Sequence, residues 1–162
     1  MPDDVNFFNA GSPLTDVDYL DVDALRLLFR LECSGEDFYN GVAERIGNER
    51  AADILRLNGR EEIGHANRLR RAIAIKCDGT YEPDAIDLER FAVPLPDEIP
   101  VEILPAIVQG ELDADKRYQR WADNEPDPEV ARLLRLNGAE ESLHADRVGQ
   151  AIALLQEASS TA

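Results

Sequence analysis

The stretch LRLNGREEIGHANRLRRAIA at residues 55–74 returns later in the chain as LRLNGAEESLHADRVGQAIA at residues 134–153. The two stretches are identical at thirteen of twenty positions, with a constant offset of 79 residues. The same offset, without a gap, pairs Glu32 with Glu111 upstream. Self-similarity at a fixed period indicates one structural unit present more than once. We therefore interpret the chain of 162 residues as two copies of a unit about 79 residues long.

Each copy has the pattern of two amphipathic helices. In the first copy, apolar residues recur at three- and four-residue steps over residues 25–42 and again over 54–73. Residues suited to cap a helix N-terminus precede three of the expected helices: Asp21, Asn48, and Asp127 followed by Pro128. We expect four helices of roughly 25 residues, each about 37 Å long at 1.5 Å per residue.

The connection between the two copies differs from the short connections inside them. Residues 77–100 lack clear periodicity and contain residues that disfavour a long helix: Gly79, Pro83, Pro94, Pro96 and Pro100. Short connections within each copy give antiparallel hairpins. Two hairpins joined by one long crossover are typical of the ferritin-like four-helix bundle, so we predict an all-α fold of that kind with an internal twofold repeat.

The predicted boundaries follow from these elements. We expect a single domain over residues 1–162, with repeat units at about 22–76 and 101–155 and a crossover at about 77–100. Pro105 leaves the start of the third long helix open, because proline disturbs a helix except in its first turn. We interpret the first 20 residues and the tail after Gln156 as arms with no assigned chemistry.

Composition narrows the class of protein. A hydrophobic content of 44% suits one domain with an ordinary core. The net charge of −16 repels phosphate backbones and anionic membranes. The sequence shows no apolar run of roughly 20 residues and no secretion signal at its start. Cys33 and Cys77 form neither a disulfide framework nor a C-x-x-C pair. We expect a cytoplasmic protein that binds neither nucleic acid nor membrane.

Six ionisable residues fall on helical stripes whose other members are apolar: Glu32, Glu62, His65, Glu111, Glu141 and His144. Burying them requires compensation, because an unpaired buried carboxylate costs several kcal/mol or stays protonated. Glu-x-x-His brings both side chains to one face of a helical turn. Two such motifs plus one glutamate from each of the other helices give four carboxylates and two imidazoles, a ligand set for two divalent ions.

Taken singly, each of these residues has an ordinary explanation, since a glutamate on a helix is usually solvated and a histidine usually a satisfied core or surface residue. That explanation does not account for the six residues taken together. His65 and His144 are the two histidines of the chain, and each follows a glutamate by three residues at equivalent repeat positions. Glu32 and Glu111 each lie 30 residues before the motif glutamate. The pattern therefore favours a metal pair.

Four further residues lie on the same faces. Tyr39 and Tyr118 follow Glu32 and Glu111 by seven residues, where a phenol can hydrogen-bond a ligand carboxylate or serve as an ordinary core aromatic. One turn after the same glutamates are two acids that could act as extra ligands, as acceptors for an imidazole N–H, or as partly solvated neighbours: Glu36 and Asp115.

This pattern resembles the ferritin-like carboxylate di-iron superfamily, and most closely the erythrin domain of rubrerythrins, over about residues 20–156. The resemblance implies that Glu62 and Glu141 bridge the two metals. It also implies that two pairs complete the ends of the centre: Glu32 with His65, and Glu111 with His144. Rubrerythrins reduce hydrogen peroxide at such a centre and take electrons from a rubredoxin-type site.

The sequence departs from the rubrerythrin pattern in two ways. Three residues after the third-helix ligand, where rubrerythrins have an additional glutamate, this chain has Ala114. A rubredoxin domain is also absent from the sequence, so an external protein would have to donate the electrons.

We therefore expect a di-iron oxidoreductase with two iron ions per chain, manganese being possible, that acts on hydrogen peroxide or dioxygen. A ferroxidase or other iron-handling protein is one alternative, and a manganese centre with catalase-like turnover is another. A non-enzymatic helical interaction module, held together by its metal, is an alternative from a different class. Bundles of this kind often pair through helix faces, so we also expect a homo-oligomer, a dimer in the first instance.

Overall fold

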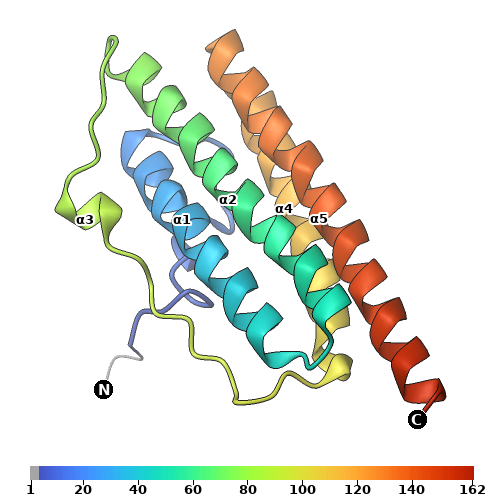
Figure 1. The fold of residues 1–162 in the computed structure, drawn as a ribbon. Helices are drawn as coiled ribbons and strands as arrows, with labels where there is room; N and C mark the ends of the chain where they lie inside the picture. The colour runs from blue at the N-terminus through green and yellow to red at the C-terminus, as the bar shows by residue number, and fades with distance from the viewer. Residues whose placement is uncertain (1–3) are drawn as a thin grey trace.

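The computed structural model describes residues 4–162, and within that range it contains helices and no strand. The long helices are α1 (Val22–Arg45), α2 (Glu49–Lys76), α4 (Leu104–Asp123) and α5 (Pro128–Ser160). A short helix, α3 (Ala85–Leu88), and two 3₁₀ turns, η1 (Ser12–Leu14) and η2 (Val101–Ile103), lie in the connecting segments. Figure 1 shows the four long helices side by side, so the all-α bundle is confirmed.

The long helices form two hairpins that face each other. α1 packs on α2, α4 packs on α5, and α2 packs on α5 (Figure 1). Asn58 of α2 donates to the His144 carbonyl of α5, and Asn137 of α5 donates to the His65 carbonyl of α2. Because the later residue of α2 meets the earlier residue of α5, these two helices run antiparallel, and the copies are related as two interlocked halves.

Side-chain caps fix where the helices begin, as the sequence predicts. Asp21 accepts a hydrogen bond from the third residue on at the start of α1, and Asn48 does the same at the start of α2. Asp127 accepts from two backbone N–H groups at the start of α5, where Pro128 has no N–H to satisfy. Because Asn48 and Asp127 are equivalent, α2 and α5 begin in the same register.

Over residues 4–20, the N-terminal segment interpreted as an arm packs on the bundle, and that interpretation was wrong for these residues. Leu14 and Leu20 are buried, and Phe7 stacks on Phe38 of α1 with ring centroids 5.1 Å apart. The tail after Gln156 continues α5 to Ser160, because no proline or glycine ends the helix there. Leu14 and Leu20 are therefore core residues although they belong to no long helix.

The crossover runs along the outer side of α1 before it reaches α4 (Figure 1). Arg26 of α1 holds α3 through Asp84 and Asp87, with N–O distances of 2.7 and 2.8 Å. α4 begins at Leu104, later than the predicted boundary at 101, and Pro105 lies in its first turn, where its missing N–H costs nothing. Within residues 4–162, no helix combines the length and apolarity required to cross a membrane.

The core has two apolar clusters, one toward each end of the bundle. One contains Leu25, Leu69 and Trp121, and the other contains Val42 and Leu55. Both clusters draw residues from both hairpins, so neither hairpin encloses its own core. The buried polar residues of the sequence pattern lie between the two clusters, and are described below.

Close packing of α4 on α5 predicts opposite effects for two glycines of α5. A Cβ at Gly138 would lie 2.9 Å from the Tyr118 Cβ and 2.7 Å from Gln119 Nε2, whereas a Cβ at Gly149 has no atom within 4 Å. We expect Gly138→Ala to lower the free energy of unfolding by about 1–3 kcal/mol through overpacking. We expect Gly149→Ala to raise it by about 0.5–1 kcal/mol through helix propensity. Urea denaturation measures both, and equal effects would contradict the packing.

Candidate metal centre

The six residues singled out from the sequence come together between the four long helices. They form two groups that share two members, Glu62 and Glu141. The first group adds Glu32 and His65, and the second adds two further residues, Glu111 and His144. Within each group the ligand atoms lie within 4.8 Å of one another, and every member is buried except Glu111, which is partly buried. These clusters are arranged so that they could hold a metal ion.

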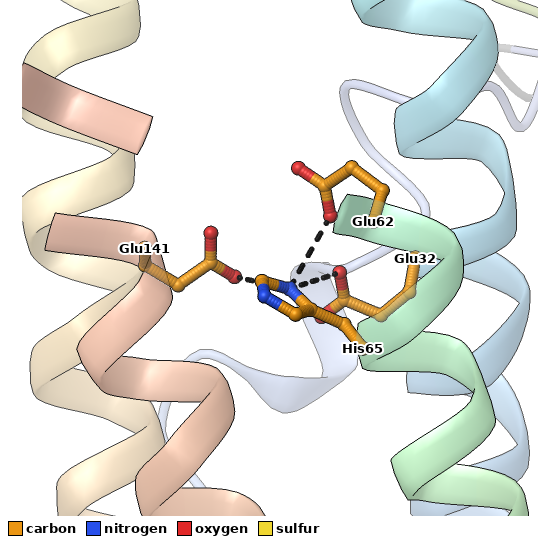
Figure 2. Close-up of side chains that lie close together, drawn as sticks. All are labelled: Glu32, Glu62, His65 and Glu141. Atoms are coloured by element: carbon orange, nitrogen blue, oxygen red, sulfur yellow. Dashed lines mark ion pairs between the residues drawn. The ribbon is translucent and has the colours of Figure 1, made fainter. Parts of the chain in front are cut away.

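Each imidazole points its Nδ1 atom at carboxylates. Figure 2 shows His65 between three of them, with Nδ1 3.5 Å from an oxygen of each: Glu32, Glu62 and Glu141. His144 Nδ1 lies 3.3 Å from Glu62 Oε1 and 3.2 Å from Glu141 Oε2. Within the described residues, neither Nδ1 atom has a hydrogen-bond partner, although both are fully buried.

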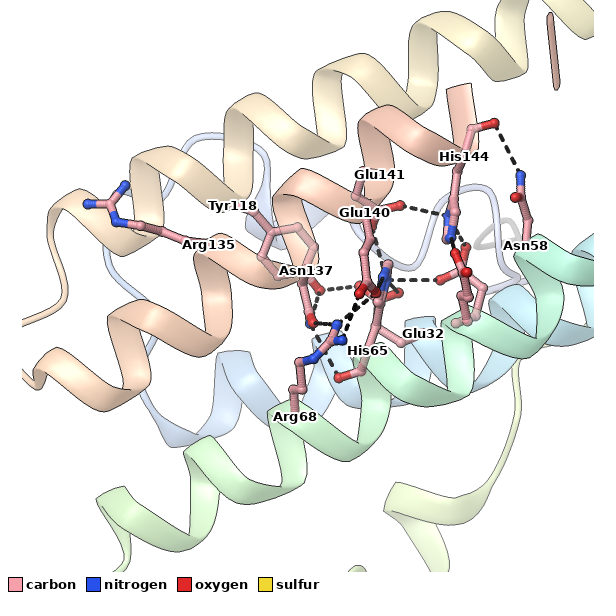
Figure 3. A network of polar contacts seen from close by, with 12 residues as sticks. Glu32, Asn58, His65, Arg68, Tyr118, Arg135, Asn137, Glu140, Glu141 and His144 are labelled. Atoms are coloured by element: carbon pink, nitrogen blue, oxygen red, sulfur yellow. Dashed lines mark hydrogen bonds and ion pairs between the residues drawn. The ribbon is translucent and has the colours of Figure 1, made fainter. Parts of the chain in front are cut away.

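The other ring nitrogen of each histidine contacts an acid that the sequence analysis did not single out. His65 Nε2 lies 3.0 Å from Glu140 Oε2, and Glu140 also accepts two hydrogen bonds from Arg68 (Figure 3). The equivalent contact joins His144 Nε2 to Glu61 at 3.1 Å, and Arg147 holds Glu61. When Nε2 carries the proton and donates a hydrogen bond to a carboxylate, Nδ1 keeps a free lone pair, as a metal ligand requires.

A sequence signal for these residues exists. Both copies have a pair of adjacent glutamates, Glu61-Glu62 and Glu140-Glu141, and an arginine three residues after the histidine. Asn58 and Asn137 belong to the same frame, since each amide donates to the other copy's histidine carbonyl and accepts from an arginine. Each imidazole is therefore held by groups from both halves.

The tyrosines make the hydrogen bonds that the sequence suggested. Tyr39 of α1 donates to Glu111 of α4, and Tyr118 of α4 donates to Glu32 of α1. Both phenols are fully buried. These contacts also cross between the copies, since each tyrosine holds the carboxylate of the opposite hairpin. Burial and the adjacent carboxylate raise the pKa of both phenols well above the usual range, so both keep their protons.

Glu36 and Asp115 lie outside both groups. Glu36 pairs with Arg90 of the crossover at 2.8 Å, and Asp115 accepts a hydrogen bond from Ser142 at 2.5 Å. The carboxylates of Glu36 and Asp115 therefore already have partners outside the metal centre. The acids that contact the imidazole Nε2 atoms are instead Glu61 and Glu140, which directly precede the motif glutamates.

The pKa values show how the protein balances four carboxylates in one buried space. Burial, with Glu62 acting in the same direction, raises the pKa of Glu32 to about 8. Burial and then Glu141 raise the pKa of Glu111 well above its usual range. Burial acts to raise the pKa of Glu62 and Glu141 too. The nearby imidazoles outweigh burial and hold the pKa of both carboxyl groups below its usual value.

Both imidazoles are correspondingly basic. Burial acts to lower the pKa of His144, but the nearby Glu141 and Glu62 carboxylates raise it to about 10. Burial also acts to lower the pKa of His65. The surrounding carboxylates outweigh burial, so this pKa is raised as well. In the metal-free chain the imidazoles and the carboxylates therefore offset part of one another's charge.

Unpartnered buried atoms show that these residues fit a metal centre. Three buried atoms without a hydrogen-bond partner face the same space: His65 Nδ1, His144 Nδ1 and Glu141 Oε2. Buried polar groups are nearly always satisfied, and an exception calls for an explanation. Imidazole nitrogen and carboxylate oxygen are ligands for divalent iron, manganese and zinc, and a cation there would satisfy all three atoms.

A cavity of about 630 Å³ reaches the centre from the side of α1 and α4. All four central carboxylates contribute to its wall: Glu32, Glu62, Glu111 and Glu141. Neither histidine does, so the imidazoles lie on the side of the centre away from the cavity. The opening gives a small molecule a path to the carboxylates without any movement of the imidazole framework.

Comparison with known proteins adds no assignment. No protein-family model, no curated protein and no solved structure matches the chain. The function therefore has to be argued from the site.

Proton balance predicts the pH dependence of stability. Because the folded-state pKa of His144 (about 10) and that of Glu32 (about 8) exceed their ordinary values of 6.5 and 4.5, the metal-free folded chain binds more protons than the unfolded chain between pH 6.5 and about 10. Its free energy of unfolding must then fall as pH rises over that interval. We expect the melting temperature to fall accordingly, and to fall less with manganous ion bound, because the metal replaces the protons. A metal-free melting temperature that rises would contradict this balance.

The contact between Glu140 and His65 predicts a loss of metal affinity in Glu140→Gln. The amide keeps the shape of the side chain but not the charge that holds the Nε2 proton and Arg68. Removing such a partner typically weakens metal binding by about 10–100-fold. Glu61→Gln should have the same effect on the equivalent side, and exposed Glu44→Gln none. Competition with a fluorescent chelator measures the metal affinity of all three variants. Equal affinities would show that the outer carboxylates, those of Glu61 and Glu140, do not position the imidazoles.

Proposed function

We propose that this chain is a dinuclear metal oxidoreductase of the ferritin-like carboxylate superfamily, of rubrerythrin type, that reduces hydrogen peroxide or dioxygen. The proposed ions are two irons per chain, with manganese as the second choice. The observation that carries the proposal is the pair of buried Nδ1 atoms, of His65 and His144, that lack a hydrogen-bond partner within residues 4–162 and face carboxylates.

The sharing of residues supports two ions rather than one. Glu62 and Glu141 belong to both groups, and each group has its own imidazole and its own further carboxylate. The six residues that would hold the ions are Glu32, Glu62, His65, Glu111, Glu141 and His144. Four carboxylates balance the charge of two divalent ions. Divalent iron, when bound, would supply one electron per ion to the oxidant.

The protein itself would supply order and protons around this reaction. Tyr39 and Tyr118 orient Glu111 and Glu32 and keep a proton on each phenol oxygen beside the centre. Arg68 and Arg147 hold the outer carboxylates and so fix both imidazoles. On the side away from the cavity, hydrogen bonds between α2 and α5 thus hold the centre.

The cavity supports access by an oxidant. Its wall includes the four central carboxylates and Ala114, the position at which rubrerythrins have an additional glutamate. A methyl group there leaves space in front of the centre where a longer side chain would extend. The proposal still requires an external electron-donor protein. The donor, the expected dimer and the cytoplasmic location stay predictions.

Metal content and oxidation kinetics test the proposal together. We expect anaerobic loading with ferrous ion to give two irons per chain by elemental analysis, and Glu62→Ala to lose the pair, because Glu62 belongs to both groups. Exposed Glu44→Ala on α1 is the matched control and should keep both. In stopped-flow spectroscopy, the loaded protein should be oxidised by hydrogen peroxide and should turn over repeatedly when a reductant is supplied.

Other outcomes would favour the alternatives. Oxidation with dioxygen followed by retention of ferric iron would indicate iron handling. Peroxide disproportionation by the manganese form alone would indicate a catalase-like enzyme. Two bound ions that are inert toward both oxidants would leave a metal-stabilised helical module. Two ions retained in Glu62→Ala would contradict the dinuclear assignment itself.

A further inference from the structure

The cavity beside the centre is long and largely apolar, which hydrogen peroxide does not require. On α1 its wall runs from Leu28 to Val42, and on α4 from Ala106 to Trp121. At 1.5 Å per residue these stretches are about 21 and 23 Å long. One leaflet of a bilayer, half of a hydrocarbon core about 30 Å thick, is about 15 Å, so the cavity is long enough for one extended acyl chain.

Apolar side chains line the cavity on both sides of the carboxylates. Toward one end the wall contains Phe38, Val42 and Ile99, and toward the other it contains Leu28 and Trp121. The N-terminal segment, through Phe7, and the crossover, through Leu95, form the rest of the wall. Its volume of about 630 Å³ lies within the usual range of small-molecule sites, about 300–1,000 Å³.

One cation belongs to this wall. Arg117 of α4 lines the cavity and, within the described part of the chain, makes no hydrogen bond or ion pair, whereas most other arginines of the bundle are paired. Thr15 lines the same end, where its carbonyl accepts a hydrogen bond from Arg120. A guanidinium with free donors beside an apolar channel recognises a carboxylate, which it can bind through two parallel hydrogen bonds.

Arg117 lies at a useful distance from the centre. It follows Glu111 by six residues, so the two are about 9 Å apart along the helix axis. A carboxylate bound at Arg117 would place several methylene groups between itself and the central carboxylates. The part of the ligand that reaches the centre is then the interior of the chain, not its head.

We propose that the cavity binds a long-chain fatty-acid hydroperoxide, with its carboxylate at Arg117 and its hydroperoxide group, carried in the interior of the chain, at the four central carboxylates. This inference rests on the proposed function for its redox step and names the substrate class of that same site. In the step the O–O bond breaks, and the hydroperoxide takes up two electrons and two protons to give the fatty alcohol group and water. Two ferrous ions, held by the six residues of the centre, would supply the two electrons and become ferric.

The acidity of the protein does not prevent binding of a carboxylate. Charges on the outer surface are screened beyond about 8 Å at physiological ionic strength, so the nearby guanidinium outweighs the distant charges. Each further buried methylene group strengthens binding, which favours a long chain over a short one.

A binding experiment on the full chain tests the site without using its activity. A conjugated, fluorescent C18 fatty acid is titrated into metal-free protein and into protein loaded with redox-inert zinc. We expect one saturable site per chain, and about tenfold weaker binding in Arg117→Gln, since the fatty-acid carboxylate then loses its charged hydrogen-bond donor. Lys116→Gln is the control, because Lys116 makes the same charge change on the exposed side of α4.

A second pair of variants tests the cavity itself. A Cβ at Gly110, in the cavity wall, has no atom within 4 Å, and the same is true of Gly149 on α5, outside the cavity. Leucine at either site improves helix propensity, so both variants should fold. We expect Gly110→Leu to weaken binding of the fatty acid about tenfold and Gly149→Leu to leave it unchanged. Equal affinities in the two variants, or no saturable binding by the wild-type chain, would overturn the proposal.

The iron-loaded protein separates this inference from the proposed function. We expect kcat/KM for a C18 fatty-acid hydroperoxide, relative to that for hydrogen peroxide, to fall about tenfold in Gly110→Leu and Arg117→Gln. Turnover of hydrogen peroxide without binding of fatty acid would refute the inference and keep the function. Binding of fatty acid at Arg117 by a protein that reduces neither peroxide would refute the function, and with it the hydroperoxide as substrate.

Discussion

Four carboxylates enclosed between four helices are the constraint on which the rest of this structure depends. Their charge has to be balanced within the bundle, and the two imidazoles with their outer Glu–Arg pairs are arranged around that requirement. In the metal-free chain burial raises the pKa of Glu32 and Glu111, and the surrounding carboxylates raise the pKa of both imidazoles, so bound protons offset part of the charge. Divalent ions would replace those protons with ligand bonds, so metal affinity and pH are linked in this protein.

The internal repeat gives the centre its geometry, because nearly every important contact crosses from one copy to the other. Tyr39 reaches Glu111, and the equivalent Tyr118 reaches Glu32. The same exchange joins each imidazole to the outer carboxylate of the opposite hairpin. A single copy would hold half of the ligands and few of their supports. A complete site therefore requires both copies, whereas positions outside it, such as Arg60 and its counterpart Ala139, differ between them.

Spacing within one helix carried the sequence predictions that the structure supports. A three-residue step places Glu62 and His65 on one face, and the caps at Asn48 and Asp127 give both copies one register. The role of Glu61 was not accessible in this way, because its contact with His144 depends on how α2 and α5 are aligned across the bundle. The N-terminal segment was misjudged for a related reason, since its burial depends on the opening between α1 and α4 rather than on any periodicity of its own.

The most direct test of the account is the position of bound metal, measured by anomalous X-ray diffraction at the manganese edge from crystals of the manganese-loaded chain. We expect two peaks per chain between Glu62 and Glu141, each beside the Nδ1 atom of one histidine, with the Nε2 atoms still on Glu140 and Glu61. A single peak, peaks only at the acidic surface, or none after loading would contradict it and leave the six buried residues as a polar network that holds only itself.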